Sequence, residues 1–460
     1  MKKVYLETYG CQMNVSDSER VATQLVSNGF EIVAEQTDAD VVLLNTCSVR
    51  EKAEQKLYTR VGQIRAAAPP PPVNSKTGGA PLIGVMGCVA QLEGESIFAR
   101  RAAASSGNNN GGIDFIVGTK AVGRIISTIE KALDGRRNFV DLGKRDDDYE
   151  WTVSPAQRQS PHVAFVPIIE GCNKFCTYCI VPFSRGREKS LPAAEILREV
   201  ELLKNQNVRE VHLIGQNVNS YRPSSDAGLE SFRGATAFSR LLRAVAVTGI
   251  ERVKFTTSFP RDFHPDIVDA IDEHENLCNW VHLPVQSGSN EVLKAMRRGH
   301  TIESYLEKID KINSSHKDIA VSSDIIVGFP GETDKNFKDT LKMAEYCRFD
   351  SAYIFKYSPR LETPAARMEN QISESVKTER FLELEKIVRK SQEAALKKHL
   401  GATLEVLAER VSSKNIDELS GHTTCHKIVN FKATGVLPGS VVPVRITAAK
   451  TNTLYGEAIG

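Results

Sequence analysis

Three cysteines lie close together in the middle of the chain, at Cys172, Cys176 and Cys179, with the spacing C-x3-C-x2-C. Thiolates are soft ligands that suit iron–sulfur clusters and zinc. A [4Fe–4S] cluster held by three thiolates keeps one iron open, and that iron can bind S-adenosylmethionine for one-electron cleavage. Zinc sites more often show paired C-x2-C knuckles or a nearby histidine, and no histidine lies between residues 163 and 211. The spacing favours an iron–sulfur site, with a three-cysteine zinc site as the alternative.

Three further cysteines are spread over the N-terminal part of the chain. Cys11, Cys47 and Cys88 each follow a predicted strand, at residues 4–8, 40–46 and 82–87. Strands that alternate with helices predict a parallel α/β sheet, where ligand sites gather beyond the carboxyl ends of the strands. We therefore expect the three thiols to converge and to hold a second cluster with one open iron. Three buried thiols that only fill the core are the alternative.

The elements that must position these cysteines can be read from the local patterns. A capping box at Ser16–Glu19 predicts a helix from there to about Asn28, with Gly29 as its end. Further helices are predicted at 50–67 and 122–133, and a fourth strand at 115–118. The polar stretch 134–160 reads as a linker, and the segments 66–80 and 102–112, rich in Pro or in Ala, Ser, Asn and Gly, read as surface insertions.

The central segment alternates six strands with helices, which predicts a partial (β/α) barrel whose chemistry lies on the loops after the strands. The cysteine loop follows the first strand, at residues 164–170. Polar residues on the other loops are candidates for binding the cofactor: Gln216, Asn217, Ser258 and Gln286. Arg185 and Arg187, just after the cysteines, are candidates for RNA phosphates, with pairing to Glu188 as the alternative. His282, Cys278 and Cys347 are expected to be structural.

The C-terminal segment begins with a predicted helix at 376–398 and continues with short β-rich runs at 403–407, 427–431 and 441–446. This spacing predicts a small β-barrel akin to folds that bind RNA on one face. The expected domains are therefore an α/β domain at 1–150, a partial barrel at 161–375, and a helical linker with a small barrel at 376–460. A metal site on His422, Cys425 and His426 is not expected.

The composition limits the class of protein. A hydrophobic fraction of 41% and a charged fraction of 25% are typical of a soluble globular protein, and the net charge of +2 gives no global sign of nucleic-acid binding. We find no signal peptide and no apolar run long enough to span a membrane, so a cytoplasmic protein is expected. Nine cysteines in such a chain indicate metal binding or catalysis and argue against a disulfide framework.

The residues around the cysteines resemble those of a known family. Tyr-Gly-Cys-Gln-Met-Asn at 9–14, Asn-Thr-Cys-Ser-Val-Arg at 45–50 and Gly-Cys-Val-Ala-Gln at 87–91 are similar to the N-terminal domain of the radical S-adenosylmethionine methylthiotransferases, in the tRNA-2-methylthio-dimethylallyladenosine synthase branch. Pro-Phe-Ser-Arg-Gly-Arg-Glu at 182–188 also resembles a motif of the family. The chain departs from it at Phe259, where the family commonly has His, and at Leu361-Glu362-Thr363, where it has Pro-Gly-Thr.

This resemblance implies a transferase that inserts a methylthio group at carbon 2 of dimethylallyl-adenosine, next to the anticodon of tRNA. It implies two [4Fe–4S] clusters and S-adenosylmethionine as cofactors, domains that face each other, and the tRNA anticodon stem-loop and a reducing electron-transfer protein as partners of a monomeric enzyme. The alternatives are the same chemistry on threonylcarbamoyl-adenosine or on a ribosomal protein, a non-catalytic iron–sulfur redox sensor that binds RNA, and a zinc-stabilised RNA-binding protein.

Overall fold

The computed structural model describes residues 1–48, 51–67, 80–98, 112–143, 153–413 and 415–459. These residues form two compact units. The first comprises Met1–Gln159 and Ile180–Arg187, and the second comprises Ser160–Cys179 and Glu188–Gly460. The segment Ile180–Arg187, which the sequence division assigns to the central domain, therefore packs with the N-terminal unit. The predicted insertions lie largely outside the described residues, as does the part of the linker at 144–152.

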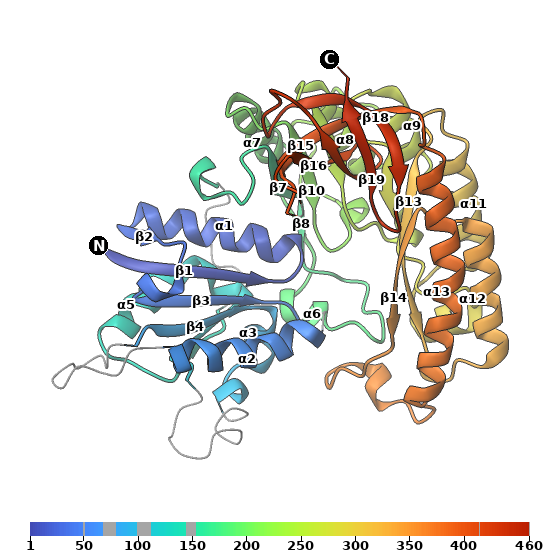
Figure 1. Ribbon diagram of the computed structural model, residues 1–460. Helices are drawn as coiled ribbons and strands as arrows, with labels where there is room; N and C mark the ends of the chain where they lie inside the picture. The colour runs from blue at the N-terminus through green and yellow to red at the C-terminus, as the bar shows by residue number, and fades with distance from the viewer. Residues whose placement is uncertain (49–50, 68–79, 99–111, 144–152, 414, 460) are drawn as a thin grey trace. The chain divides into compact units, whose positions relative to one another are not determined.

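A six-stranded parallel sheet in the order β2-β1-β3-β4-β5-β6 forms the core of the first unit (Figure 1). Alternate residues of the central strands pack on opposite faces: Val41 and Leu43 belong to one buried cluster, and Val42 and Leu44 to another. The predicted parallel α/β architecture is confirmed, and the short edge strands β2 and β6 were not predicted. The elements are β1 (Lys2–Tyr9), α1 (Gln12–Ser27), β2 (Phe30–Ile32), β3 (Val41–Thr46), α2 (Glu51–Ala67), β4 (Leu82–Gly87), α3 (Cys88–Glu93), β5 (Phe115–Gly118), α5 (Ile125–Leu133) and β6 (Phe139–Asp141).

Helix α1 begins earlier than the sequence predicted. Its first residue is Gln12, and Cys11 is its N-cap with an extended backbone, so the capping box at Ser16–Glu19 does not start the helix. Those polar side chains are buried, and Asp17, Ser18 and Glu19 make tertiary contacts. Ser18 Oγ accepts a hydrogen bond from Asn45 Nδ2 at 2.9 Å, and the Glu19 carboxylate accepts one from the Gln159 amide at 2.9 Å. The pattern is typical of a cap, but Ser18 and Glu19 have partners elsewhere in the first unit.

Six parallel strands in the second unit form the predicted partial barrel, with one helix layer outside (Figure 1). Two three-stranded sheets, β7-β10-β11 and β12-β13-β14, are joined by backbone hydrogen bonds such as Ser258 N to His282 O at 3.0 Å. Strands β7 and β14 are thus the two ends of the curved sheet. The elements are β7 (Val163–Pro167), α7 (Ala193–Asn205), β10 (Glu210–Ile214), α8 (Ala237–Val247), β11 (Arg252–Phe255), α9 (Asp266–Glu273), β12 (Trp280–His282), α10 (Asn290–Ala295), α11 (Ile302–Asn313), β13 (Ala320–Val327), α12 (Asp334–Cys347) and β14 (Ser351–Lys356).

The same unit continues into helix α13 (Glu374–Lys397) and a closed barrel of five strands in the order β15-β16-β17-β19-β18. This confirms the predicted small barrel. The sequence missed β16 and β19, because β16 carries polar residues that are buried instead of an alternating apolar pattern. The strands are β15 (Thr403–Val411), β16 (Glu418–Thr423), β17 (Ile428–Lys432), β18 (Val441–Ala449) and β19 (Leu454–Ala458). Among the described residues, no helix is both long and apolar enough to cross a membrane.

A buried ionic network attaches the C-terminal barrel to the start of β10 and β11. Glu210 contacts Lys254 Nζ at 3.1 Å, Arg252 Nε at 3.0 Å and His422 Nε2 at 2.8 Å. Burial opposes the ionisation of Glu210, but Lys254, His422 and His212 outweigh it and hold the pKa of the carboxyl well below its usual value. The network explains why β16 carries a buried histidine. With two cations already on the carboxylate, it is a structural anchor and a poor site for a metal cation.

Candidate metal centres

The loop that carries Cys172, Cys176 and Cys179 follows β7 and the short strand β8 (Ile169–Glu170). Gly171, with φ of +73°, supplies the left-handed turn that starts the loop. Thr177 anchors its far end, because its amide donates to Met296 O at 3.1 Å and its hydroxyl to Ala295 O at 2.9 Å. Cys172 and Cys176 are buried and Cys179 is half-buried. One short, anchored turn therefore presents all three thiols.

Two side chains from other barrel loops donate hydrogen bonds to these sulfurs. Asn217 Nδ2 donates to Cys172 Sγ at 3.1 Å, and Arg298 Nη1 donates to Cys176 Sγ at 3.5 Å. Hydrogen bonds of this kind stabilise coordinating thiolates and tune the potential of iron–sulfur clusters. Burial raises the pKa of the Cys172 thiol, so the charged form needs a compensating cation nearby. Sulfur donors with prepared hydrogen-bond partners fit a metal cluster that this loop would hold.

Phe259, the departure from the family pattern, has a defined place in this site. The guanidinium of Arg298 lies over its ring, 4.3 Å from the centroid, and Arg298 Nη2 also donates to Pro284 O at 2.7 Å. These contacts hold the guanidinium beside Cys176. An aromatic ring can orient a cation in this way without any proton transfer, so the position supports the loop without an imidazole.

The residues predicted to bind the cofactor occupy the loops around the cysteine turn. The side-chain oxygens of Gln216, Thr256 and Ser258 are buried, and none has a hydrogen-bond partner among the residues that the structure describes. Buried polar atoms are nearly always paired, so unpaired ones grouped beside a metal loop indicate a polar ligand. Thr256 was not singled out from the sequence, because a threonine at a strand end carries no distinctive signal. The cofactor roles of these residues remain predictions.

Two of the predicted residues have protein partners of their own. Asn217 donates to Cys172, as described above. Gln286 adopts a φ of +75°, and its backbone bonds both ends of one β13 segment: its amide donates to Asp324 O at 2.9 Å and its carbonyl accepts from Ile326 N at 2.8 Å. This strained turn fixes the path of the Gln286 loop, which lies at the carboxyl end of the barrel. His282 is hydrogen-bonded to Ser322 Oγ at 2.9 Å, as expected of a structural histidine.

The second set of cysteines lies at one edge of the N-terminal sheet. Strands β1, β3 and β4 are adjacent and parallel, with Tyr9 paired with Thr46 and Thr46 with Gly87. Cys11, Cys47 and Cys88 follow these strand ends, which is the convergence that the strand pattern predicted. Gly87 is required at its position, because it has a φ of +96° and a Cβ there would meet Asn45 Oδ1 at 2.3 Å.

The thiols of this set interact with one another. A hydrogen bond from Cys47 is the main reason that the pKa of Cys11 falls to about 6, against the opposing effect of burial and with help from Arg185. The Cys88 thiol has its pKa raised by burial, which Arg185 partly offsets. No disulfide joins any of the nine cysteines, all of which lie in the described residues. A lowered pKa at Cys11, beside two buried thiols that form no disulfide, fits a metal site.

Arg185 has a different environment from the one expected at an RNA surface. It ends helix α6 (Val181–Arg185), is 5% exposed, and its Nη2 lies 2.6 Å from Asp17 Oδ2 inside the first unit. The expectation that it contacts RNA phosphates is corrected, because a buried guanidinium paired with Asp17 faces the cysteines. Its ion pair is with Asp17, whereas Glu188 lies near Lys174. Arg187, two residues further on, is exposed and remains a candidate for phosphate contact.

Comparisons with known proteins agree with this division of the chain. Residues 166–344 match the radical SAM superfamily, residues 3–106 match the uncharacterized protein family UPF0004, and residues 397–459 match the TRAM domain. The match to the radical SAM superfamily implies that the central barrel uses a [4Fe–4S] cluster and S-adenosylmethionine as cofactors. The methyltransferase TsrM from Kitasatospora setae, solved with cobalamin and a [4Fe–4S] cluster, has a similar fold, with a TM-score of 0.55 at 14% identity over 80% of this chain and 74% of that one.

Relatives match over the full length. A tRNA-2-methylthio-N(6)-dimethylallyladenosine synthase from Koribacter versatilis is 39% identical over 464 residues, which cover 100% of this chain and 98% of the relative. The proteins of the same name from Alkalilimnicola ehrlichii and Fusobacterium nucleatum are 40% and 39% identical, over 98% and 100% of their own lengths. The chain belongs to the tRNA-2-methylthio-N(6)-dimethylallyladenosine synthase family.

Proposed function

We propose that the chain is a tRNA methylthiotransferase that inserts a methylthio group at carbon 2 of dimethylallyl-adenosine next to the anticodon, in a radical reaction that uses S-adenosylmethionine. The observation that carries the proposal is the presence of two separate sets of three cysteines, one on the loop after β8 and one at the ends of β1, β3 and β4. The full-length similarity to synthases of that name supports the substrate.

Each cysteine set has a proposed task. Cys172, Cys176 and Cys179 would hold the cluster that binds S-adenosylmethionine, and Cys11, Cys47 and Cys88 would hold a second [4Fe–4S] cluster. When bound, the two clusters supply the electron for cleavage of S-adenosylmethionine and a site for the transferred sulfur. The protein residues hold and tune them. Asn217 and Arg298 donate to sulfurs of the first set, and Gln216, Thr256 and Ser258 offer polar atoms to the cofactor.

The RNA partner would be the anticodon stem-loop, in which bases can leave the stack at modest cost. The C-terminal barrel and the exposed Arg187 are the proposed contacts with it. Turnover also needs a reducing electron-transfer protein, and we propose that the enzyme acts as a monomer in the cytoplasm.

The test is anaerobic reconstitution with iron and sulfide, followed by mass spectrometry of tRNA after turnover. The proposal predicts a methylthio group on dimethylallyl-adenosine, with no modification of threonylcarbamoyl-adenosine or ribosomal protein offered in parallel. Modification of either of those acceptors instead would show that the enzyme performs the same chemistry on a different substrate. Cluster-loaded, reduced protein that cleaves no S-adenosylmethionine would contradict an enzymatic role and favour an RNA-binding redox sensor.

A further inference from the structure

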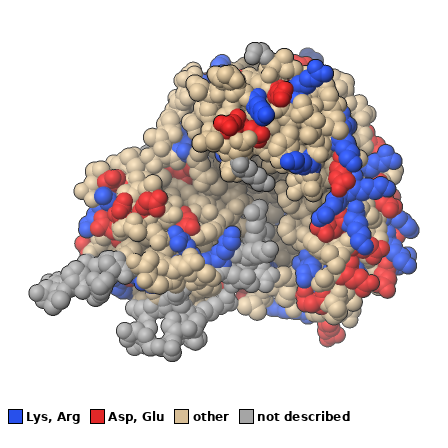
Figure 2. Space-filling view, in the orientation of Figure 1, with Lys and Arg blue, Asp and Glu red and all other residues tan. Residues whose placement is uncertain are grey.

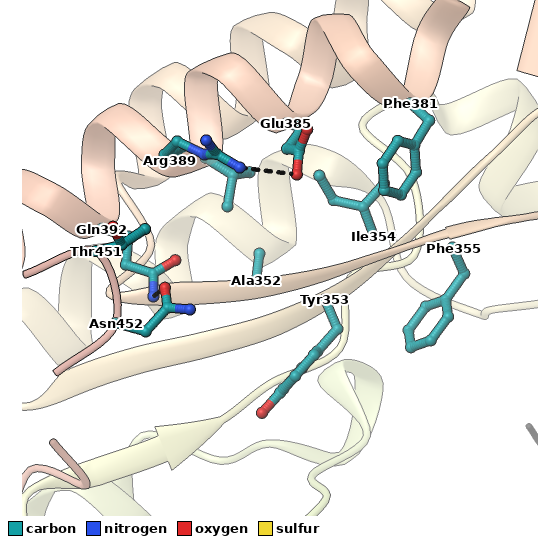
Figure 3. Close-up of a pocket in the computed structure, with 11 residues that line it drawn as sticks. Ala352, Tyr353, Ile354, Phe355, Phe381, Glu385, Arg389, Gln392, Thr451 and Asn452 are labelled. Carbon is teal, nitrogen blue, oxygen red and sulfur yellow. Dashed lines mark hydrogen bonds and ion pairs between the residues drawn. The ribbon is translucent and has the colours of Figure 1, made fainter. Parts of the chain in front are cut away.

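Two large aromatic side chains remain exposed on β14, an end strand of the partial barrel. Tyr353 is 62% exposed and Phe355 is 45% exposed, although aromatic rings of this size normally contribute to cores. Figure 3 shows Ala352 and Ile354 on the side of β14 that faces helix α13, with Tyr353 and Phe355 on the opposite side. The two rings are two residues apart, so they project from the same face of the strand.

The strand register identifies that face as the inside of the barrel. Tyr353 pairs with Asp324 and Phe355 pairs with Ile326 on β13. Paired residues point to the same side of a sheet. Asp324 Oδ2 lies 3.6 Å from His282 Nε2, and Ile326 belongs to a buried cluster against which Tyr178 of the cysteine loop packs. The exposed rings therefore share the barrel interior with the loop that carries Cys172, Cys176 and Cys179.

Their position at an end of the sheet suits a large ligand. Among the described residues β14 pairs only with β13, so its other edge is not extended by another strand. A cofactor-sized molecule is mostly enclosed by its site, and the unpaired polar oxygens suited to it come from Gln216, Thr256 and Ser258 after β10 and β11. Rings that stay half exposed at the opposite end of the sheet are better suited to a group that arrives with a macromolecule.

The mixed surface charge on this unit indicates that RNA would need contacts other than ion pairs. Figure 2 shows Lys and Arg intermixed with Asp and Glu where α12 and α13 lie, and on α13 Arg389 pairs with Glu385 at 3.2 Å. RNA that is not held by a strong positive field needs stacking and shape complementarity. Aromatic rings provide this, because every nucleobase has a π face.

We infer that Tyr353 and Phe355 form a stacking subsite for an unstacked purine base of the substrate RNA, on the inner face of β14 beside the cysteine loop. The inference rests on the proposed function, which supplies the RNA. Adenine could also come from S-adenosylmethionine, and the experiment separates these two sources.

The experiment measures equilibrium binding of a fluorescently labelled anticodon stem-loop that contains dimethylallyl-adenosine to the full-length, cluster-reconstituted protein without reductant. Base–aromatic stacking is strong enough for Tyr353→Ala or Phe355→Ala to weaken binding by roughly tenfold. Tyr353→Phe keeps the ring and is expected to retain the wild-type affinity. Tyr346→Ala is the matched control, because Tyr346 is 54% exposed on α12 and its hydroxyl bonds Asp310.

Thermal midpoints of all variants verify folding. Stem-loop affinity that is unchanged in both alanine variants would overturn the inference and leave the proposed function intact. Weakened binding of S-adenosylmethionine in equilibrium dialysis, with RNA affinity unchanged, would also overturn it by assigning the rings to the cofactor. Wild-type protein that binds no stem-loop would contradict the proposed function itself, and the inference with it.

Discussion

The two cysteine sets reach the same ligand chemistry by opposite routes. Cys172, Cys176 and Cys179 lie on one short turn that Thr177 anchors to residues 295 and 296. Cys11, Cys47 and Cys88 come from distant parts of the sequence and meet only because β1, β3 and β4 are neighbours in the sheet. The first set therefore depends on local loop geometry, whereas the second depends on the folding of the whole N-terminal sheet.

Each set has one buried arginine beside its sulfurs, but the charge balance differs. Arg185 is ion-paired with Asp17, so the second set faces a nearly neutral pair. Arg298 is held by the Pro284 carbonyl and the Phe259 ring, and it has no carboxylate ion pair among the residues that the structure describes. A net positive charge favours the reduced form of a cluster. A cluster on the loop set would thus be the easier one to reduce, in keeping with its proposed role in cleaving S-adenosylmethionine.

The largest effect is expected from removing a cysteine of the loop set. Cys176→Ala should abolish both cleavage of S-adenosylmethionine and methylthio transfer, because the loop would lose a cluster ligand. The measurement is deoxyadenosine release by reduced protein, followed by liquid chromatography. Cys347→Ala is the matched control, because that thiol is buried at the end of α12 and belongs to neither set. Substantial cleavage by Cys176→Ala would remove the distinction between the sets.

Removing a cysteine of the strand-end set should separate the two reactions. Cys11→Ala is expected to retain cleavage of S-adenosylmethionine while losing sulfur insertion into tRNA, since only the second cluster is disturbed. Mass spectrometry of the tRNA and assay of deoxyadenosine in the same reaction provide both readouts. If Cys11→Ala keeps both reactions, the second cluster is misassigned.

A smaller effect is expected from the arginine of the strand-end set. Arg185→Gln removes a buried cation, so the potential of that cluster should become more negative. Asp17→Asn should shift it the other way, and the double variant should return it toward wild type. Redox titration followed by electron paramagnetic resonance measures this in protein whose loop cysteines are replaced by Ala. Arg187→Gln makes the same charge change at an exposed position, and an equal shift there would contradict a local role for Arg185.

The smallest effect is expected from Asn217, a neutral donor to Cys172. Neutral hydrogen bonds are about half as strong as charge-assisted ones. Asn217→Ala should therefore shift the potential of the loop cluster in the negative direction by less than Arg298→Gln does. The same redox titration, performed on protein that lacks Cys11, Cys47 and Cys88, gives both values. A larger shift for Asn217→Ala would mean that hydrogen bonding outweighs charge at this loop.

Sequence reasoning succeeded where a pattern is local or follows a general rule of sheets. The C-x3-C-x2-C spacing and the cysteines at strand ends were sufficient to predict both sets, because parallel strands necessarily bring their carboxyl ends together. Sequence reasoning failed where the partners of a side chain lie far from it in the sequence. In the capping box at Ser16–Glu19, Ser18 bonds Asn45 of β3 and Glu19 bonds the Gln159 amide, and Arg185 pairs with Asp17. Strand β16 was not predicted, because its buried His422 is polar and pairs with Glu210 on another strand.

The central claim is that two independent cysteine sets each hold a [4Fe–4S] cluster. Iron and acid-labile sulfide analysis after anaerobic reconstitution tests it directly, on wild type and on two triple variants in which Cys172, Cys176 and Cys179, or Cys11, Cys47 and Cys88, are all replaced by Ala. We predict about eight iron and eight sulfide per wild-type chain, and about four of each in either variant. About four in wild type, with no further loss on replacing Cys11, Cys47 and Cys88, would contradict the account.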